Sequence, residues 1–325
     1  MQEIVNNIFS VSATTFKEHA IKIFHFQYAH NSVYRQWVDA LHVDVNAVTK
    51  VTDIPFLPVS FFKSHEIVTG DFAPQTVFES SGTTDTVNSK HFVKDINIYT
   101  ESFEEGFKQF YGAPDEWCII GLLPSYLERK GSSLIMMVDE LIKLSAHPQS
   151  GFYLNEFEKL HEVLKGLEAK KQKTLLIGVT FALLDFAEQF PMELKYTTVM
   201  ETGGMKGRRR EMVREEVHSI LQNQLKVSAV HSEYGMTELL SQGYSYGKGI
   251  FTTVPWMKVL VRDEDDPLLI KNKGRGLINV IDLANIYSCS FIATDDAGKI
   301  FDDGSFEVLG RRDTSDIRGC SLMFM

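Results

Sequence analysis

The sequence predicts an α/β fold, in which strands and helices alternate, followed by a small antiparallel β subdomain. Apolar runs of strand length alternate with segments of helical period between residues 117 and 225, and this pattern is typical of a largely parallel sheet covered by helices. After about Gly249, short β-branched runs are separated by turn signals, as in antiparallel sheets. The 325 residues are 44% hydrophobic, which is enough for a large packed core, and no linker divides them.

The individual elements follow from the two hydrophobic periods. Trp117–Leu123 is a short apolar run bounded by Pro124 and predicts a strand, whereas Ser132–Ser145 has its apolar residues at helical spacing. The other expected elements are a helix over Asn155–Lys170, a strand over Thr174–Val179, a helix opening near Thr180, a strand over Tyr196–Met200, a helix over Arg208–Leu225 and a strand over Lys226–Val230. The turn signals of the last quarter are Asp263–Pro267, Lys273–Gly276, Asp296–Gly298 and Asp302–Gly304. We therefore expect an α/β body over residues 1–249 and a β-rich subdomain over residues 250–325.

Charge and composition argue against several classes of protein. The formal net charge is −10 with both signs mixed along the chain, which disfavours a general nucleic-acid binder. No window approaches the roughly 18 consecutive apolar residues of a membrane span, and Met1–Thr15 lacks the pattern of a secretory signal. The three cysteines, Cys118, Cys289 and Cys320, are widely separated, as expected of reduced intracellular thiols. We expect a cytoplasmic protein without a membrane span that acts on small molecules.

Small hydroxyl residues surround a glycine in the stretch Ser80–Asp85. Hydroxyls and backbone N–H groups donate hydrogen bonds to phosphates, and glycine permits close approach. The stretch is not a Walker loop, because no Gly-Lys-Ser/Thr follows it. A polar turn is the alternative interpretation.

A second stretch, His231–Glu238, follows the expected strand over Lys226–Val230. Ligands of open α/β sheets gather at the carboxyl ends of strands. Tyr234 could stack on a base, Thr237 could bond a phosphate oxygen and Glu238 could hold Mg²⁺, which prefers carboxylate and phosphate oxygens. The alternative is a strand-end turn with a helix starting at Thr237.

A third stretch contains Thr294-Asp295-Asp296, and Leu309–Gly319 follows it. An ionised aspartate can accept both ribose hydroxyls, and each such charge-assisted hydrogen bond contributes about 1.5–3 kcal/mol. The alternative is a hairpin turn that ends at Gly298.

The order of these stretches resembles the motif series of the adenylate-forming superfamily, which includes acyl-CoA synthetases, luciferases and peptide-synthetase adenylation domains. The five stretches are Ser80–Asp85, Gly203-Gly204, Tyr234–Glu238, Thr294-Asp295 and Gly310–Gly319. The resemblance implies the N-terminal-domain fold of that superfamily, a layered αβαβα body with a small antiparallel β subdomain, and the cofactors ATP and Mg²⁺. The implied cofactor-binding residues are Ser81, Gly82, Thr83 and Thr84 at the phosphates, Gly203, Gly204, Tyr234 and Gly235 near the adenine, and Asp295 and Arg311 at the ribose. Thr237 would contact the α-phosphate, and Glu238 would bind the metal.

Within that superfamily the chain is most similar to the acyl-protein synthetase (LuxE-like) family of the bacterial bioluminescence fatty-acid reductase system. The stretches that carry this similarity are Phe78–Thr84, Leu122–Tyr126, Glu201–Gly207 and Asp316–Leu322. That family passes the activated acyl group to a cysteine near the C-terminus, and Cys320 occupies the matching place, with a packing role beside Leu322 as the alternative. The resemblance also implies that the C-terminal lid domain is absent, because the sequence stops at Met325.

The expected function is ATP-dependent activation of a carboxylic acid to acyl-AMP, with a fatty acid as the favoured class, followed by transfer to a protein cysteine thiol. Thr237, Glu238 and Cys320 would be the catalytic residues, and a protein that accepts or donates the acyl group would be the partner. Two alternatives stay open. One is an aryl- or acyl-CoA ligase resembling the phenylacetate type, and the other is a nucleotide-binding subunit without catalysis.

Overall fold

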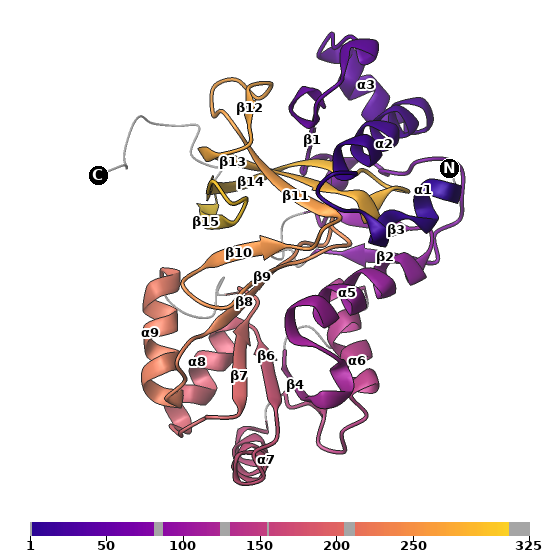
Figure 1. Cartoon of the computed structure of the whole chain (residues 1–325). Coiled ribbons are helices and arrows are strands. Elements are labelled where there is room, and N and C mark those ends of the chain that lie inside the picture. Colours follow the sequence, from indigo (N-terminus) through magenta and orange to yellow (C-terminus); the bar gives the residue numbers. More distant parts are fainter. Residues whose placement is uncertain (1, 81–86, 124–130, 155, 205–211, 312–325) are drawn as a thin grey trace.

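The computed structural model describes residues 2–80, 87–123, 131–154, 156–204 and 212–311. Its strands form one mixed 13-stranded sheet and a separate two-stranded sheet. One half of the large sheet is parallel and flanked by helices, and the other half is antiparallel (Figure 1). The α/β class expected from the sequence is therefore confirmed.

The parallel half consists of five strands in the spatial order β5-β4-β6-β7-β8. Their bounds are β4 Cys118–Leu122, β5 Gly151–Phe152, β6 Thr174–Gly178, β7 Thr197–Glu201 and β8 His231–Tyr234. Every residue of β4 and β6 is buried, as expected for parallel strands covered on both faces. The chain moves outward from β4 to β5 and then returns past β4 to β6, so its direction across the sheet reverses there.

Helices lie on both faces of these parallel strands. They are α5 Ile96–Tyr111, α6 Ser133–Ser145, α7 Phe157–Ala169, α8 Thr180–Gln189 and α9 Arg214–Leu225. Figure 1 shows α5 and α6 on one side of the strands and α8 and α9 on the other. The connection that leaves β4 crosses the sheet in one direction, and the connections after β6 cross it in the other. Because connections between parallel strands are right-handed, helices in the two groups of connections lie on opposite faces. The carboxyl ends of these strands therefore form the edge at which ligands of such sheets bind.

The antiparallel half continues from β8 in the order β9-β10-β15-β14-β13-β11-β12. Its bounds are β9 Gly243–Ser245, β10 Ile250–Thr253, β11 Met257–Arg262, β12 Ile270–Lys271, β13 Gly274–Asp282, β14 Phe291–Ile300 and β15 Phe306–Arg311. The antiparallel character expected of the last quarter is thus confirmed. The sheet runs from β9 into β10 across residue 249 without a break, and the division into two units at that residue stays a prediction.

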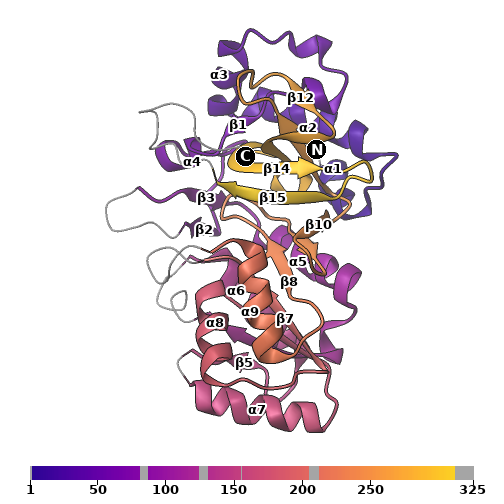
Figure 2. The same ribbon diagram turned by 90° about the vertical axis from the view of Figure 1, so that its left-hand side faces the viewer.

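The N-terminal segment packs on the antiparallel half (Figures 1 and 2). Its elements are α1 Gln2–Asn6, α2 Phe16–His30, α3 Ser32–Ala40, β1 Leu57–Pro58 and α4 Phe61–Ser64, followed by the separate hairpin of β2 Thr76–Glu79 and β3 Lys90–Val93. Short 3₁₀ helices lie at Ile8–Ser10, Val45–Ala47, Val51–Asp53, Pro114–Glu116 and, as η5, Leu283–Asn285. Strand β1 pairs with β14, and the buried Gln27 amide donates to the carbonyl of Ile286 at 2.9 Å and accepts from the N–H of Ser290 at 2.9 Å. Because the residues in these contacts are far apart in the sequence, no local sequence pattern predicts the contacts.

The expected strand over Lys226–Val230 was wrong. Lys226 has a φ of 53° and caps the end of α9, so residues 226–230 connect the helix to β8, which begins at His231. The helix expected over Arg208–Leu225 begins at Arg214 within the described residues, and residues 208–211 lie outside them. The other expected strands and helices are confirmed to within two residues at each end.

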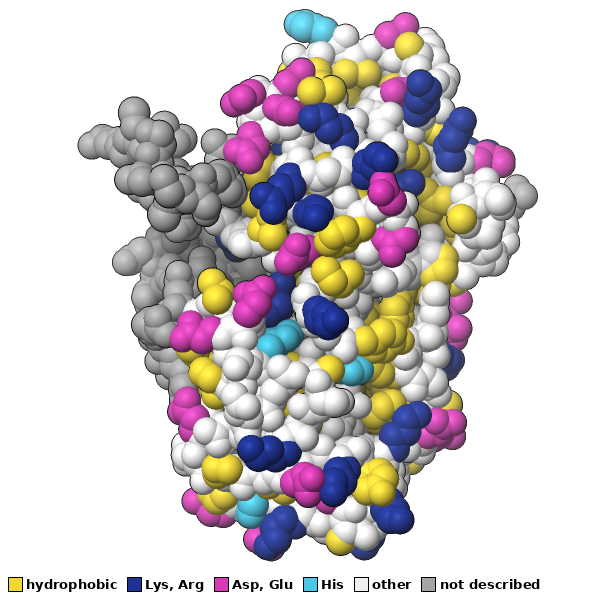
Figure 3. Space-filling model, turned by 60° about the vertical axis from the view of Figure 1, so that its left-hand side comes forward, with side chains coloured by type: hydrophobic (Ala, Val, Ile, Leu, Met, Phe, Trp, Pro, Cys, Tyr) yellow, Lys and Arg dark blue, Asp and Glu magenta, His cyan; other side chains and the backbone are white. Residues whose placement is uncertain are grey.

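Charged side chains of both signs are interspersed on the face shown in Figure 3. This matches the mixed charge of the sequence. In the part of the chain that the structure describes, no helix is long and apolar enough to cross a membrane. The cytoplasmic location stays a prediction.

Buried Asp282, the last residue of β13, anchors the segment that follows β8. Its carboxylate accepts hydrogen bonds from the N–H groups of Leu240 at 2.7 Å, Ser241 at 3.1 Å and Ala284 at 3.1 Å. It also accepts one from the Ser241 hydroxyl at 2.6 Å, and that hydroxyl lies 3.1 Å from the Ser102 hydroxyl of α5. One carboxylate therefore joins α5, the segment after β8 and the antiparallel half.

We predict that Asp282→Ala lowers the free energy of unfolding by about 3 kcal/mol or more, because each buried donor left without an acceptor costs about 1–3 kcal/mol. Urea unfolding followed by circular dichroism measures the change. The matched control is Asp303→Ala, which removes a carboxylate from an exposed turn and should leave the midpoint near the wild-type value. Equal midpoints for the two variants would contradict the anchoring role.

Candidate functional site

The carboxyl ends of β7 and β8 bring two of the expected stretches together. These strands are parallel neighbours, with Met200 opposite His231 and Glu201 opposite Ser232. Because side-by-side parallel strands end at the same edge, Gly203 and Tyr234 lie next to each other there. The Gly203-Gly204 turn and the end of β8 are therefore neighbours in the fold.

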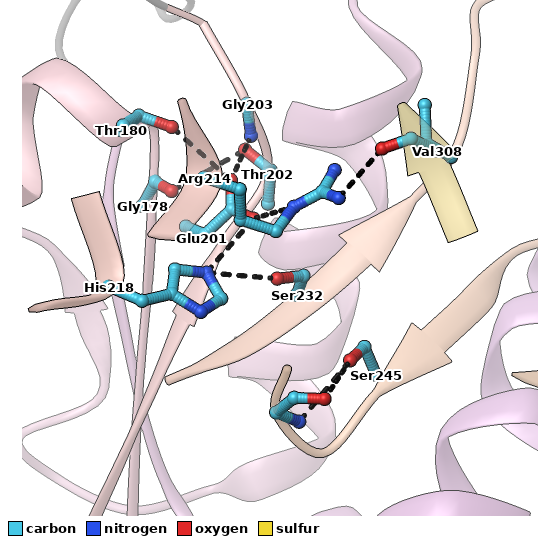
Figure 4. Close-up of polar contacts among 11 residues, drawn as sticks. Gly178, Thr180, Glu201, Thr202, Gly203, Arg214, His218, Ser232, Ser245 and Val308 are labelled. Carbon is cyan, nitrogen blue, oxygen red and sulfur yellow. Dashed lines mark hydrogen bonds and ion pairs between the residues drawn. The ribbon is translucent and has the colours of Figure 1, made fainter. Parts of the chain in front are cut away.

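The Gly203-Gly204 turn has a backbone that suits glycine. The φ angles are 75° and 91°, in the region that other residues rarely adopt. The Gly203 N–H donates to Oε2 of Glu201 at 2.7 Å (Figure 4). The Gly203 carbonyl accepts from the N–H of Thr180 at 2.9 Å. The turn is thus fixed against the first residue of α8, and Gly204 is exposed.

Tyr234 lies at the end of β8 with its hydroxyl pointing to the antiparallel half. The hydroxyl donates to Oδ2 of Asp296 at 2.9 Å, and the ring packs edge-on against Phe306. Burial raises the pKa of Tyr234 well above its usual value, so the phenol keeps its proton. Tyr234 therefore connects the parallel half of the site to β14.

Asp296 completes this contact with Arg311. The two residues are paired across β14 and β15, and Nε of Arg311 lies 3.9 Å from Oδ1 of Asp296. Burial raises the pKa of Asp296, although the Tyr234 hydroxyl and the Arg311 charge act in the opposite direction. Asp296 is thus the aspartate bonded to Tyr234, and Asp295, the residue expected at the ribose, precedes it in β14.

The turn signal at Asp296–Gly298, and with it the alternative of a hairpin that ends at Gly298, was wrong. Strand β14 continues through that position to Ile300, and the chain turns at Asp302–Gly304. The register of β14 is irregular just before it, because residues 294–296 lie between the pairs Ala293 with Asn279 and Ala297 with Leu277. The choice between the two adjacent aspartates therefore had no local signal in the sequence.

The Thr237-Glu238 segment is a turn, so the alternative of a helix starting there was wrong. Nδ1 of His91, from β3, lies 2.9 Å from the Thr237 carbonyl, and its Nε2 lies 2.9 Å from Oδ1 of Asn285 in η5. The Asn285 amide donates to the Glu238 carbonyl at 2.7 Å. Burial lowers the pKa of His91 to about 4, although the hydrogen bonds with Thr237 and Asn285 act in the opposite direction. Two residues that no sequence motif indicated thus set the backbone of this turn.

The Glu238 side chain is almost completely buried. Burial raises its pKa, whereas a hydrogen bond from Ser89 and the charges of Arg311 and Lys63 lower it. Ser89 also donates its N–H to the Ser80 hydroxyl at 2.9 Å. The expected phosphate-binding residues Ser81, Gly82, Thr83 and Thr84 lie outside the described residues.

This donor set fits a metal-bound polyphosphate. One carboxylate, Glu238, supplies the kind of oxygen ligand that Mg²⁺ prefers, and phosphate oxygens and water commonly complete such a shell. The positive charges of Arg311 and Lys63 act on this carboxylate and favour its ionised form. Thr237 precedes the carboxylate and is partly exposed, as is Met236, while Gly235 is exposed.

The two cysteines within the described residues are unsuited to nucleophilic chemistry. Burial raises the pKa of Cys118 to about 11 and that of Cys289 to about 12. Both thiols therefore stay protonated at neutral pH, and the thiolate is the reactive form. Cys320, the expected acyl carrier, lies outside the described residues.

Comparisons with solved structures show which proteins share this fold. ATP-bound MatB from Rhodopseudomonas palustris is similar with a TM-score of 0.55 and 17% identity, covering 74% of this chain and 49% of that one. 2-Hydroxyisobutyryl-CoA ligase in the postadenylation state, in complex with R3-HIB-AMP, is similar with a TM-score of 0.62 and 11% identity, covering 94% of this chain and 70% of that one. The chain thus spans about half the length of MatB, and these identities support the fold alone.

Two further comparisons concern curated proteins and protein families. A comparison with curated proteins finds no match. The acyl-protein synthetase family LuxE, in contrast, matches residues 10–325, which is nearly the entire chain and includes every stretch that forms the site. The chain therefore belongs to the LuxE acyl-protein synthetase family.

Proposed function

We propose that the protein uses ATP to convert a carboxylic acid to acyl-AMP and then transfers the acyl group to a protein cysteine thiol. The observation that carries the proposal is the convergence of Tyr234, Glu238, Asp296 and Arg311 with the Gly203-Gly204 turn at one edge of the sheet. Membership of the acyl-protein synthetase family supports the same chemistry. A fatty acid is the favoured class of substrate.

The nucleotide would lie across the ends of β7 and β8. The backbone of Gly203, Gly204 and Gly235 and the ring of Tyr234 would border the adenine. Asp296, with Arg311 beside it, would hold the ribose hydroxyls, because a carboxylate is the acceptor that a pair of hydroxyls requires. This assignment replaces Asp295 by its neighbour, since Asp296 is the aspartate that contacts Tyr234.

The phosphates would extend from the ribose toward the Thr237-Glu238 turn. Thr237 would contact the α-phosphate, and Ser81, Gly82, Thr83 and Thr84 would contact the outer phosphates. Glu238 would hold Mg²⁺, which when bound neutralises charge as pyrophosphate leaves. The charges of Lys63 and Arg311 near Glu238 support a polyanion at this position.

The reaction has two balanced steps. In the first step a carboxylate oxygen of the acid attacks the α-phosphorus of ATP, and the bond to pyrophosphate breaks. In the second step the Cys320 thiolate attacks the acyl carbonyl carbon of acyl-AMP, a C–S bond forms, and the C–O bond to AMP breaks. A thiolate is a strong nucleophile toward such a mixed anhydride. An acyl-accepting or acyl-donating protein would be the partner.

Exchange of labelled pyrophosphate into ATP tests the first step. An acid that supports exchange demonstrates reversible formation of acyl-AMP, and a panel of acids of different chain length identifies the substrate class. A panel in which no acid supports exchange would favour a nucleotide-binding subunit without catalysis. Release of the product as a coenzyme A thioester, without labelled protein, would favour a CoA ligase.

We predict that Asp296→Ala weakens ATP binding roughly 10-fold or more, because a charge-assisted hydrogen bond contributes about 1.5–3 kcal/mol. Asp295→Ala is the matched control, since it removes the adjacent carboxylate and keeps the one that is bonded to Tyr234, and it should bind ATP nearly as tightly as the wild type. Isothermal titration calorimetry measures both affinities. A larger loss of ATP affinity in Asp295→Ala than in Asp296→Ala would instead assign the ribose contact to Asp295.

We predict that Cys320→Ser keeps pyrophosphate exchange and loses the hydroxylamine-sensitive acyl label, because a serine hydroxyl does not form a thioester. Denaturing gels after incubation with labelled acid and ATP measure the label. Cys118→Ser is the control and should retain it, since Cys118 is buried next to the Ser150 hydroxyl. A label that survives in Cys320→Ser would remove this residue from the mechanism.

A further inference from the structure

Arg214 connects three parts of the structure that are distant in the sequence. It is the first residue of α9, and its Nη1 donates to the carbonyl of Val308 in β15 at 3.0 Å. Its guanidinium lies over the ring of Phe251 in β10, and its Nε lies 3.8 Å from Oε1 of Glu201 at the end of β7. Figure 4 shows the side chain extending from Glu201 to Val308. One guanidinium thus links the parallel half to the antiparallel half.

The other oxygen of Glu201 holds the glycine turn. Oε2 accepts the N–H of Gly203 at 2.7 Å and the hydroxyl of Thr180 at 3.2 Å. Burial, the largest influence, acts to raise the pKa of Glu201, but contacts with His218, Ser232, Arg214 and the Gly203 N–H together lower it. The carboxylate is therefore ionised, and it binds Arg214 and the turn at the same time.

A β-bulge follows the point at which Arg214 holds β15. Gly298 is opposite Val308, but Ala297 is opposite Gly310, so Leu309 is an extra residue in the strand. A bulge bends its strand and redirects the side chains beyond it. In this case it brings Arg311 opposite Asp296. The position of Val308 therefore determines where the strand places Arg311.

We propose that Arg214, held by Glu201, is a positioning residue that fixes the Arg311 end of β15 relative to the Gly203-Gly204 turn. It sets the separation between the two sides of the nucleotide site without touching the nucleotide. This inference rests on the proposed function, which places a nucleotide between these two sides. An arginine suits the role because its N–H groups form a rigid fork, so Nε and Nη1 reach two acceptors in fixed directions.

A double-mutant cycle tests the proposal. The variants are Arg214→Met, Arg311→Met and the double variant, because methionine keeps an apolar stem over Phe251 but removes the charge. We expect the ATP affinity to fall about 10-fold in Arg311→Met and about 5-fold in Arg214→Met, each equivalent to about one lost hydrogen bond of ordinary strength. The double variant should bind within 2-fold of Arg311→Met, because residues that act through one another are not additive.

Two further variants separate positioning from charge and from general destabilisation. Arg214→Lys keeps the charge but has a single ammonium, so it should bind ATP about as weakly as Arg214→Met. Arg275→Met, in the exposed start of β13, is the control and should leave the affinity unchanged. Calorimetry is carried out below the unfolding temperature of every variant, so that a change in stability does not alter the measured affinity.

The outcomes distinguish this inference from the proposed function. The positioning role would be overturned if the fold losses of ATP affinity in the two single variants multiplied in the double variant. Wild-type affinity in Arg214→Lys would also overturn it. Either result would leave the proposed nucleotide site intact. An unchanged affinity in Arg311→Met would instead contradict the ribose assignment of the proposed function, and the positioning role would fail with it. The expected pattern, a loss in each single variant and no further loss in the double variant, supports both.

Discussion

The buried hydrogen bonds of the segment after β8 are the interaction on which the site depends. Backbone N–H and carbonyl groups that leave a sheet inside a protein must find partners, because an unpaired buried polar group is costly. Asp282 accepts from the N–H groups of Leu240 and Ser241, while His91 and Asn285 bind the carbonyls of Thr237 and Glu238. These partners come from β13, β3 and η5, so the turn acquires its shape only when all three elements are in place.

The same arrangement explains how charge is distributed at the candidate site. Asp296 is paired with Arg311 across β14 and β15, and the positive charges of Arg311 and Lys63 act on Glu238. A polyphosphate with a metal ion would find both signs of charge at such an edge. The Glu201 to Arg214 contact then fixes one side of this edge against the other, because the carboxylate also holds the Gly203 turn.

Much of the fold could be predicted from local patterns, and the failures have separate causes. The buried runs of β4 and β6 and the helical spacing of α6 were sufficient to locate those elements. The strand expected over 226–230 failed because Lys226 has a positive φ and caps α9, so that pairing with β7 begins only at His231. The turn expected at Asp296–Gly298 failed because a glycine-containing stretch suits both turns and strands, and the pairing of β14 with β13 and β15 decided the outcome.

By itself the sequence determined the α/β class, the order of the motif stretches and the family to which they belong, because periodicity and motif spacing are properties of neighbouring residues. Only the tertiary structure decided that Asp296 rather than Asp295 faces Tyr234, that His91 and Asn285 hold the turn at Thr237, and that Arg214 reaches Val308. Those choices depend on strand length, register and a bulge. Such features arise from pairing between segments that lie far apart along the chain.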